Sequence, residues 1–288
     1  MARLARLRFA IAAGVSILAS QACDVTIKDG DVSFNQLHGR AKQEWNRKYP
    51  FTPGGRIEIV NANGPIDIVA GPAGTVEVAA VLDARSMSDE HSKDLLSEAK
   101  IEETVTPGHI RIATATRDSS IAGLGHRRHG RLDVAYKVTV PLDARVEMSG
   151  NNGNLTAQGL GGHIKAVVAN GAVELSGLRG SVDAAAVNGS ITVKMAEVTA
   201  PVRLESTNGR IRLELPKDAR ATLKVLSVNG GIHVTGLPTQ DASGRRIRNL
   251  ESALNGGGPE IDVRVTNGRI TITGVDRQSP GADRPAPP

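Results

Sequence analysis

Seven Asn-Gly dipeptides share one pattern of apolar neighbours, and this pattern constrains the fold more than any other feature of the sequence. Residues six and four positions before each Asn, and three and five positions after it, are apolar in all seven copies. From the second copy the steps are 18, 18, 20, 21 and 38 residues, the last being two repeats with an insertion. The predicted turn residues are Asn63, Gly64, Asn152, Gly153, Asn170, Gly171, Asn188, Gly189, Asn208, Gly209, Asn229, Gly230, Asn267 and Gly268.

Apolar alternation on both sides of a Gly-containing corner predicts two half-buried strands in each repeat. If the repeats stack in parallel, the chain is an all-β, single-chain parallel β-solenoid, or β-helix, of about 18–21-residue repeats. The competing interpretation is an antiparallel meander, because Asn-Gly is also a strong hairpin signal.

The residue five positions before each Asn is charged in every copy, and this column favours the stack. Stacked strands lie about 4.8 Å apart, so alternating charges would form an outward ladder that fixes the register. Hairpins would give no reason for alternation down one column. The sign alternates along Glu147, Lys165, Asp183 and Arg203, and the other members are Glu58, Lys224 and Asp262.

The composition indicates a narrow core. Only 2% of the residues are aromatic, whereas 40% are hydrophobic, so Val, Ile, Leu and Ala must fill the interior. We therefore expect no internal ligand cavity. Any site must lie on the outer face, in an insertion or at an end of the stack.

Residues 70–144 break the period and predict an insertion near the N-terminal end of the stack. The segments TVEVAAVLDA, HIRIATAT and LDVAYKVTV are typical of strands. The segment SDEHSKDLLSEAKIEE, residues 88–103, predicts a helix with Ser88 as its N-cap and acidic residues in its first turn. We expect the insertion to cap or flank the solenoid.

The N-terminus predicts an exported protein. Three arginines precede an apolar run over residues 9–19, as in a signal peptide that here would span residues 1–22. The only cysteine, Cys23, resembles the lipobox cysteine of bacterial lipoproteins, which implies lipidation and a membrane anchor. Ordinary cleavage after Ala22 is the alternative. We expect the protein in the cell envelope, facing the periplasm or the cell surface.

The flanking segments are polar. Residues 23–50 predict a tether, residues 51–275 the repeat domain, and the Pro-rich residues 276–288 a disordered tail. The chain has 35 Lys and Arg against 30 Asp and Glu, and subtracting the three arginines of the leader leaves 32 against 30. Charge therefore gives no argument for a nucleic-acid partner.

Residues 51–275 resemble the bacterial DUF4097 β-strand-repeat proteins. The resemblance rests on three segments: GGRIEIVNANGPIDIVAG at the start, VTVPLDARVEMSGNNGNLTAQGLGG where the repeats resume, and LNGGGPEIDVRVTNGRITITG at the end. It implies a β-repeat fold and an adhesin-like role. It brings no established catalytic residues.

The polar clusters show no pattern specific to catalysis, so we predict no catalytic residue, metal site or cofactor. His126 and His129 could share a metal on a helix, but neighbouring glycines and arginines favour a mobile basic loop over residues 125–131. GRRIRN, residues 244–249, indicates a second solvated loop. Glycoside hydrolysis needs paired carboxylates at a fixed separation. The column four positions after each Asn mixes residue types: Asp67, Thr156, Glu174, Thr192, Arg212, His233 and Thr271.

These features together predict a non-catalytic cell-envelope protein, an adhesin or scaffold. Its long outer strand faces would bind a repetitive partner, such as envelope polysaccharide or an envelope protein. Two alternatives stay open: a protein partner in envelope-stress signalling, and a β-helix enzyme that acts on polysaccharide.

Overall fold

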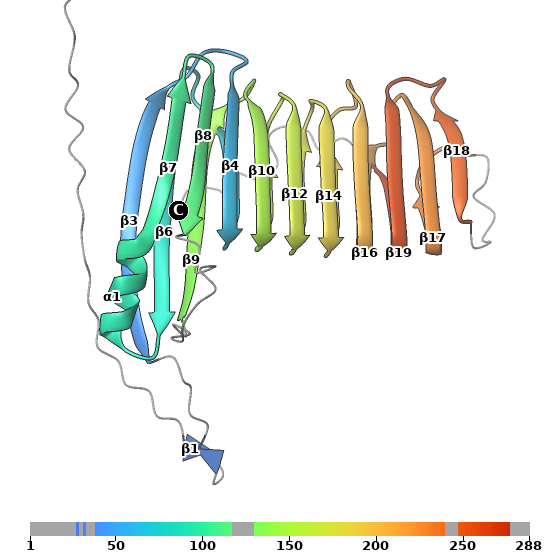
Figure 1. Cartoon of the computed structure of the whole chain (residues 1–288). Coiled ribbons are helices and arrows are strands. Elements are labelled where there is room, and N and C mark those ends of the chain that lie inside the picture. The colour runs from blue at the N-terminus through green and yellow to red at the C-terminus, as the bar shows by residue number, and fades with distance from the viewer. Residues whose placement is uncertain (1–26, 29–30, 33–37, 117–129, 240–246, 277–288) are drawn as a thin grey trace, which may run out of the picture.

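The computed structural model describes residues 27–28, 31–32, 38–116, 130–239 and 247–276 (Figure 1). A long mixed sheet of 17 strands, which does not close on itself, contains every strand except β1 (Ile27–Lys28) and β2 (Asp31–Val32), which pair with each other. The helix of the described region is α1 (Asp89–Glu98). The prediction of an all-β chain with one helix is confirmed.

The strands of the long sheet are named here in chain order. They are β3 (Gly39–Pro50), β4 (Arg56–Asn63), β5 (Ile66–Gly71), β6 (Thr75–Ser86), β7 (Ala99–Thr106), β8 (His109–Thr116), β9 (Gly130–Pro141), β10 (Arg145–Asn152), β11 (Leu155–Gln158), β12 (Ile164–Asn170), β13 (Val173–Leu178), β14 (Val182–Asn188), β15 (Ile191–Met195), β16 (Val202–Pro216), β17 (Ala221–Thr235), β18 (Asn249–Leu254) and β19 (Glu260–Val275).

The Asn-Gly corners divide the repeats into two rows of strands, one behind the other in Figure 1. We call the row that precedes the corners the first wall; it contains β4, β10, β12 and β14. The row that follows them is the second wall, with β5, β11, β13 and β15. The long strands β16, β17 and β19 run through the corner and contribute to both walls.

Strands of neighbouring repeats pair in parallel with the register that the Asn-Gly spacing suggests. Asn152 pairs with Asn170, Asn170 with Asn188, and Asn188 with Asn208. In the second wall, β13 likewise pairs in parallel with β11 and β15. Apolar side chains of both walls point inward to one aliphatic cluster, whose members include Ile57, Ile164 and Val173, each with an exposed fraction of 0%. The apolar columns thus form the core.

The order of strands in space departs from their order in the chain at the C-terminal end. The last repeat strand, β19, lies between β16 and β17. Direct pairing of β16 with β17 would place Arg203 beside Lys224, whereas the inserted strand puts Asp262 between them. From Glu147 onward, the charged column of the first wall therefore alternates through Lys165, Asp183, Arg203, Asp262, Lys224 and Glu251. On its other side Glu147 pairs with Glu58, a like charge, so the alternation ends at β10.

The insertion over residues 70–144 does more than cap or flank the repeats, because two of its strands extend the walls. β8 pairs in parallel with β4, and β9 pairs in parallel with β5. Helix α1 begins after Ser88, whose Oγ accepts a hydrogen bond from the His91 backbone N–H at 3.3 Å, as predicted. The helix ends at Glu98, earlier than predicted, because the following residues pair with β8 as the edge strand β7.

The predicted tether over residues 23–50 is wrong in its second half. β3 pairs antiparallel with β6 along its whole length, so residues 39–50 belong to the sheet. Its inward side chains include Ala41 and Tyr49, which are buried, but also Arg47. The Arg47 guanidinium lies 4.9 Å from the centre of the Trp45 ring and 3.4 Å from a Glu103 carboxylate oxygen. An inward arginine, which is paired here with Trp45 and with the distant Glu103, weakens the apolar alternation that signals a strand.

Candidate functional site

A shallow polar trough lies on the outer face of the second wall. Its main part has a volume of about 560 Å³ and is formed by β9, β5, β11 and β13. A neighbouring depression of about 420 Å³ shares Lys137 and Thr139 with it and continues across β6 and β3. We call the two together the trough.

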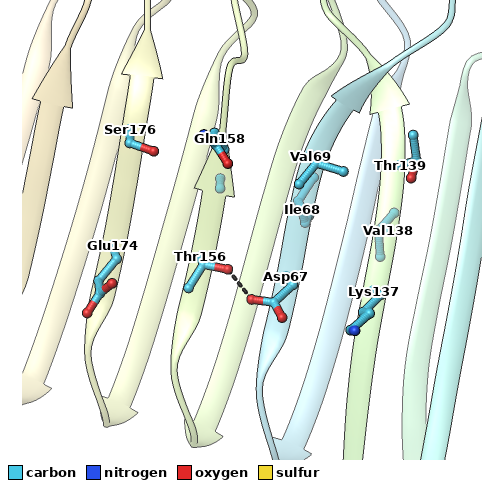
Figure 2. A pocket seen from close by; sticks show the side chains of 11 residues that line it. Asp67, Ile68, Val69, Lys137, Val138, Thr139, Thr156, Gln158, Glu174 and Ser176 are labelled. Atoms are coloured by element: carbon cyan, nitrogen blue, oxygen red, sulfur yellow. Dashed lines mark hydrogen bonds between the residues drawn. The ribbon is translucent and has the colours of Figure 1, made fainter. Parts of the chain in front are cut away.

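Two rows of outward side chains form the main part of the trough (Figure 2). They arise because positions four and six after each Asn point outward, in alternation with the buried positions three and five. In-register pairing then aligns equivalent positions across the strands. The first row is Lys137, Asp67, Thr156 and Glu174, and the second row is Thr139, Val69, Gln158 and Ser176.

The first row combines opposite charges with hydrogen-bonding groups. Lys137 lies beside Asp67 on the neighbouring strand. The Thr156 hydroxyl donates a hydrogen bond to the Asp67 carboxylate, and Glu174 is exposed beyond it. In the neighbouring depression, Lys48 Nζ lies 2.7 Å from a Glu77 carboxylate oxygen. The trough therefore offers charged, hydroxyl and amide groups side by side, which is the chemistry that hydrogen-bonds sugar hydroxyls or polar peptide groups.

Beneath the trough the strand pairing changes from antiparallel to parallel. β9 pairs in parallel with β5 on one side and antiparallel with β6 on the other. β3, β6 and β9 have 12 residues each, whereas β5 has 6 and β11 has 4. The trough thus crosses from the long antiparallel strands to the short parallel repeats, and the regular repeats alone would give a flatter face.

A buried polar network lies behind this part of the wall. Asn61 donates hydrogen bonds to the carbonyl oxygens of Val134 at 2.7 Å and Gly64 at 3.1 Å. Thr114 Oγ1 donates to Asn61 Oδ1 at 3.2 Å and lies 2.7 Å from the Tyr136 hydroxyl. Burial raises the pKa of Tyr136 to about 12, so its hydroxyl stays protonated at physiological pH. The network satisfies polar groups that the end of the repeat stack leaves inside.

The predicted turn asparagines form one continuous ladder of side-chain amides. The ladder follows the order of the strands in space, with Asn267 between Asn208 and Asn229. Stacked amides of this kind stabilise in-register β assemblies. Each Nδ2 donates to the next Oδ1: Asn152 to Asn63 at 2.8 Å, Asn170 to Asn152 at 3.1 Å, Asn188 to Asn170 and Asn208 to Asn188 at 3.0 Å, Asn267 to Asn208 at 2.9 Å, and Asn229 to Asn267 at 2.8 Å.

The glycine after each Asn lies against the backbone of the strand that stacks on it, which in every copy except Gly64 belongs to a neighbouring repeat. A Cβ at Gly171 would overlap the carbonyl oxygen of Gly153, and a Cβ at Gly189 would overlap that of Gly171. Gly171 also has a φ of +152°. Similar overlaps with backbone carbonyl oxygens occur at Gly64, Gly153, Gly209, Gly230 and Gly268. These predicted turn residues therefore serve the close approach of repeats.

Several sequence candidates lie outside the described residues. They are the predicted signal peptide and Cys23, the histidines His126 and His129, and residues 277–288 of the predicted tail. Of the second basic segment, residues 247–249 are described, and Ile247 bridges to Ile232 of β17. Within the described ranges, no group of three or more His, Cys, Asp and Glu side chains could hold a metal ion. No helix of the described chain has the length and apolar character needed to cross a membrane.

Sequence reasoning placed the site on the outer face but missed the trough. Asp67, Thr156 and Glu174 were recognised as one mixed column. Lys137 and Thr139 lie in the insertion, where no repeat spacing could align them with that column. The signal that could have found them is the alternation in LDVAYKVTV, which marks a strand able to extend the second wall.

The fold and this surface define a class: a β-repeat protein with an aliphatic core, an amide ladder at its corners and a polar outer face. The chain belongs to the Toastrack DUF4097 family, whose model matches residues 14–273. This match confirms the resemblance seen in the sequence. No match was found among curated proteins.

Solved structures similar to the chain include two candidate adhesion proteins. One, a cell adhesion protein candidate from Clostridium sporogenes, is 12% identical with a TM-score of 0.39 and covers 81% of this chain and 100% of its own. The other, an adhesin candidate from Bacteroides fragilis, is 12% identical with a TM-score of 0.38, covering 81% and 97%. A candidate lipid-binding protein from Parabacteroides distasonis is 9% identical with a TM-score of 0.32, covering 80% and 96%.

Proposed function

We propose that the chain is a non-catalytic protein of the bacterial cell envelope that binds a repetitive polymer, such as polysaccharide, along the outer face of its second wall. The trough carries the proposal. It is a polar depression on an otherwise regular face, and its rows of side chains continue at the same register along the repeats. A polymer seated in the trough would meet equivalent positions on each following strand.

In this proposal the stacked repeats form a stiff parallel β-solenoid. Neighbouring strands present outer side chains about 4.8 Å apart. Each contact to a polymer is weak, but contacts on one rigid scaffold add through a high effective concentration. The amide ladder and the narrow aliphatic core supply the stiffness. The same architecture suits an adhesin or a scaffold, because both need a long rigid surface.

Binding of envelope polysaccharide fractions to the immobilised protein tests the proposal. Replacing Gln158 and Ser176 with Ala removes two hydrogen-bonding groups of the trough and leaves its buried residues unchanged. At about 1 kcal/mol for each hydrogen bond, affinity should fall about tenfold or more. The matched control replaces Thr104 and Ser149 with Ala, because these exposed hydroxyl residues lie on the outer face of the first wall, away from the proposed binding face. Equal losses for both variants, or no glycan binding by the protein, would contradict the proposal.

A polysaccharide-acting enzyme is the second candidate, and the positions of Asp67 and Glu174 favour it. They share one row with Thr156 between them, so their backbones lie two strand spacings, about 10 Å, apart. Inverting glycosidases hold two carboxyl groups about 6.5–9.5 Å apart. Release of reducing ends from envelope polysaccharide, abolished by Asp67→Asn or Glu174→Gln, would establish this function in place of binding alone.

The envelope location rests on the N-terminal leader and on Cys23. If Cys23 carries the lipid, Cys23→Ala should move the protein from the membrane fraction to the soluble fraction of cells. Retention in the membrane fraction would contradict lipidation at this residue. A signalling role would be indicated instead if crosslinking in cells recovered one envelope protein while the purified chain bound no glycan.

A further inference from the structure

We infer that the outer face of β16 and β19 carries a binding site for anionic glycans, built on Arg210, Arg269 and Arg212. We call these residues the arginine triad. The inference rests on the proposed binding role and names a partner class for the distal part of the second wall. The triad lies on strands beyond β11 and β13, so it is separate from the residues that line the trough.

The triad is compact because of strand register. Arg210 pairs with Arg269 on the neighbouring strand, so their side chains emerge about 4.8 Å apart. Arg212 lies two residues along β16 and points to the same side, about 7 Å away. All three side chains are exposed. Three guanidinium groups can therefore converge on one oxyanion, or on neighbouring oxyanions of a linear chain.

Like charges on directly neighbouring strands destabilise a sheet unless something compensates them. Other neighbouring arginines of the described chain have such compensation. Arg85 lies 3.3 Å from an Asp83 oxygen, and Arg131 lies 2.7 Å from an Asp133 oxygen. Arg56 lies 2.6 Å from a Glu147 oxygen. These arginines belong to the neighbouring pairs Arg40/Arg85, Arg85/Arg131 and Arg56/Arg145.

Arg210 and Arg269 lack this compensation. No carboxylate within the described residues forms an ion pair with either of them, or with Arg212. Glu214, the next outward residue of β16, pairs instead with Lys194 at 3.4 Å. The fold therefore gives no reason to hold these charges together. An external anion would supply the missing counter-charge.

The surroundings of the triad favour a glycan over other polyanions. Thr192 on β15 and Thr271 on β19 flank Arg212 in its outward row, and the exposed Ser190 directly precedes β15; these residues offer hydroxyl groups for hydrogen bonds to sugar. In their described part the outward rows of the triad contain no Phe, Tyr or Trp, the side chains on which nucleic-acid bases stack. A flat, hydroxyl-rich face with aligned arginines suits an extended polysaccharide that bears sulfate, phosphate or carboxylate groups.

Binding of dextran sulfate to the full chain, with uncharged dextran of equal length as the reference, tests the site. We expect binding to dextran sulfate only, weakened by added salt because exposed charges are screened. Replacing Arg210 and Arg269 with Gln should weaken binding at least tenfold. The matched control replaces Arg203 and Arg264, which lie on the same two strands but on the outer face of the first wall. The control should bind nearly as well as the original chain.

Thermal unfolding gives an independent readout. Arg203 and Arg264 lie 3.7 Å and 2.9 Å from the carboxylates of Glu205 and Asp262, so the control variant should lose some stability. The Arg210→Gln, Arg269→Gln variant should keep or raise its Tm, because it relieves repulsion without breaking an ion pair. A Tm of this variant below that of the control would overturn the argument.

Other outcomes separate the partner classes. If the two variants lose dextran sulfate binding equally, binding depends on the general positive charge of the chain, and the proposal of a specific site at the arginine triad is wrong. Tighter binding of single-stranded DNA, or of vesicles containing phosphatidylglycerol, than of dextran sulfate would overturn the glycan assignment. If envelope polysaccharide still binds the Arg210→Gln, Arg269→Gln variant with full affinity, the triad is refuted while the proposed function survives. If no envelope glycan binds either protein, the proposed function fails as well.

Discussion

The substitution Gly171→Ala should destabilise the chain strongly, because this glycine lies where two repeats touch. A Cβ there would overlap the Gly153 carbonyl oxygen, so the two strands would have to separate. Separation would break two hydrogen bonds. One runs from the Gly153 N–H to the Asn170 carbonyl oxygen at 3.0 Å, and the other from Asn170 Nδ2 to Asn152 Oδ1 at 3.1 Å. Each costs about 1 kcal/mol. The φ of +152° adds about 1–3 kcal/mol for a residue with a side chain.

The free energy of unfolding should therefore fall by about 3–5 kcal/mol in total, and Tm should fall by at least about 6 °C for a chain of this size. Thermal unfolding followed by far-UV circular dichroism measures the change. Gly177→Ala is the matched control in the same repeat, because φ is also positive, +66°, but the nearest atom to a Cβ is 3.5 Å away. The control should cost only about 1–2 kcal/mol. Equal Tm values for the two variants would refute the argument from close stacking.

Three further predictions follow from the ladder, the buried tyrosines and the charged column. Asn188→Ala removes two side-chain hydrogen bonds of 3.0 Å and should lower the free energy of unfolding, measured in urea, by about 1–2 kcal/mol. No change would mean that the ladder adds no stability. Burial raises the pKa of both Tyr49 and Tyr136, so an absorbance titration of the folded chain should show no tyrosinate until well above pH 10. Burial raises the pKa of Tyr136 to about 12, so between pH 10 and pH 12 this residue should lower the free energy of unfolding by about 1.4 kcal/mol per pH unit. Tyr49, whose pKa is also raised, should lower it further in the same range. Asp262→Lys creates a run of cations and should cost about 1–2 kcal/mol at low salt, more than Glu174→Lys, whose paired strand neighbours are both threonines.

Local patterns predicted the elements of the repeat well. Alternation around each Asn-Gly gave the strands, and Ser88 with the acidic residues after it gave the start of α1. Prediction failed where a residue's partner is distant in the chain. Residues 39–50 were predicted as part of a tether because the segment is polar and only weakly periodic. The structure shows that the inward Arg47 interrupts the apolar alternation, and its partner Glu103 lies on a strand that the sequence suggested was helix.

The candidate site was predicted only in part for the same reason. The repeat spacing aligned Asp67, Thr156 and Glu174, but Lys137 joined them only when β9 paired with β5. Similarly, Arg210 and Arg269 lie 59 residues apart in the sequence, and no spacing brings them together. They become neighbours because β19 inserts beside β16.

The sequence alone determined the unit of this protein: an apolar strand, an Asn-Gly corner and a second apolar strand, repeated so that only an aliphatic β core could form. These features are local, since alternation and glycine act within a few residues. The tertiary structure decided the order in which the units stack. That order sets which outer side chains become neighbours. It places the trough, puts Asp262 between Arg203 and Lys224, and sets Arg210 beside Arg269, with which no carboxylate of the described residues forms an ion pair.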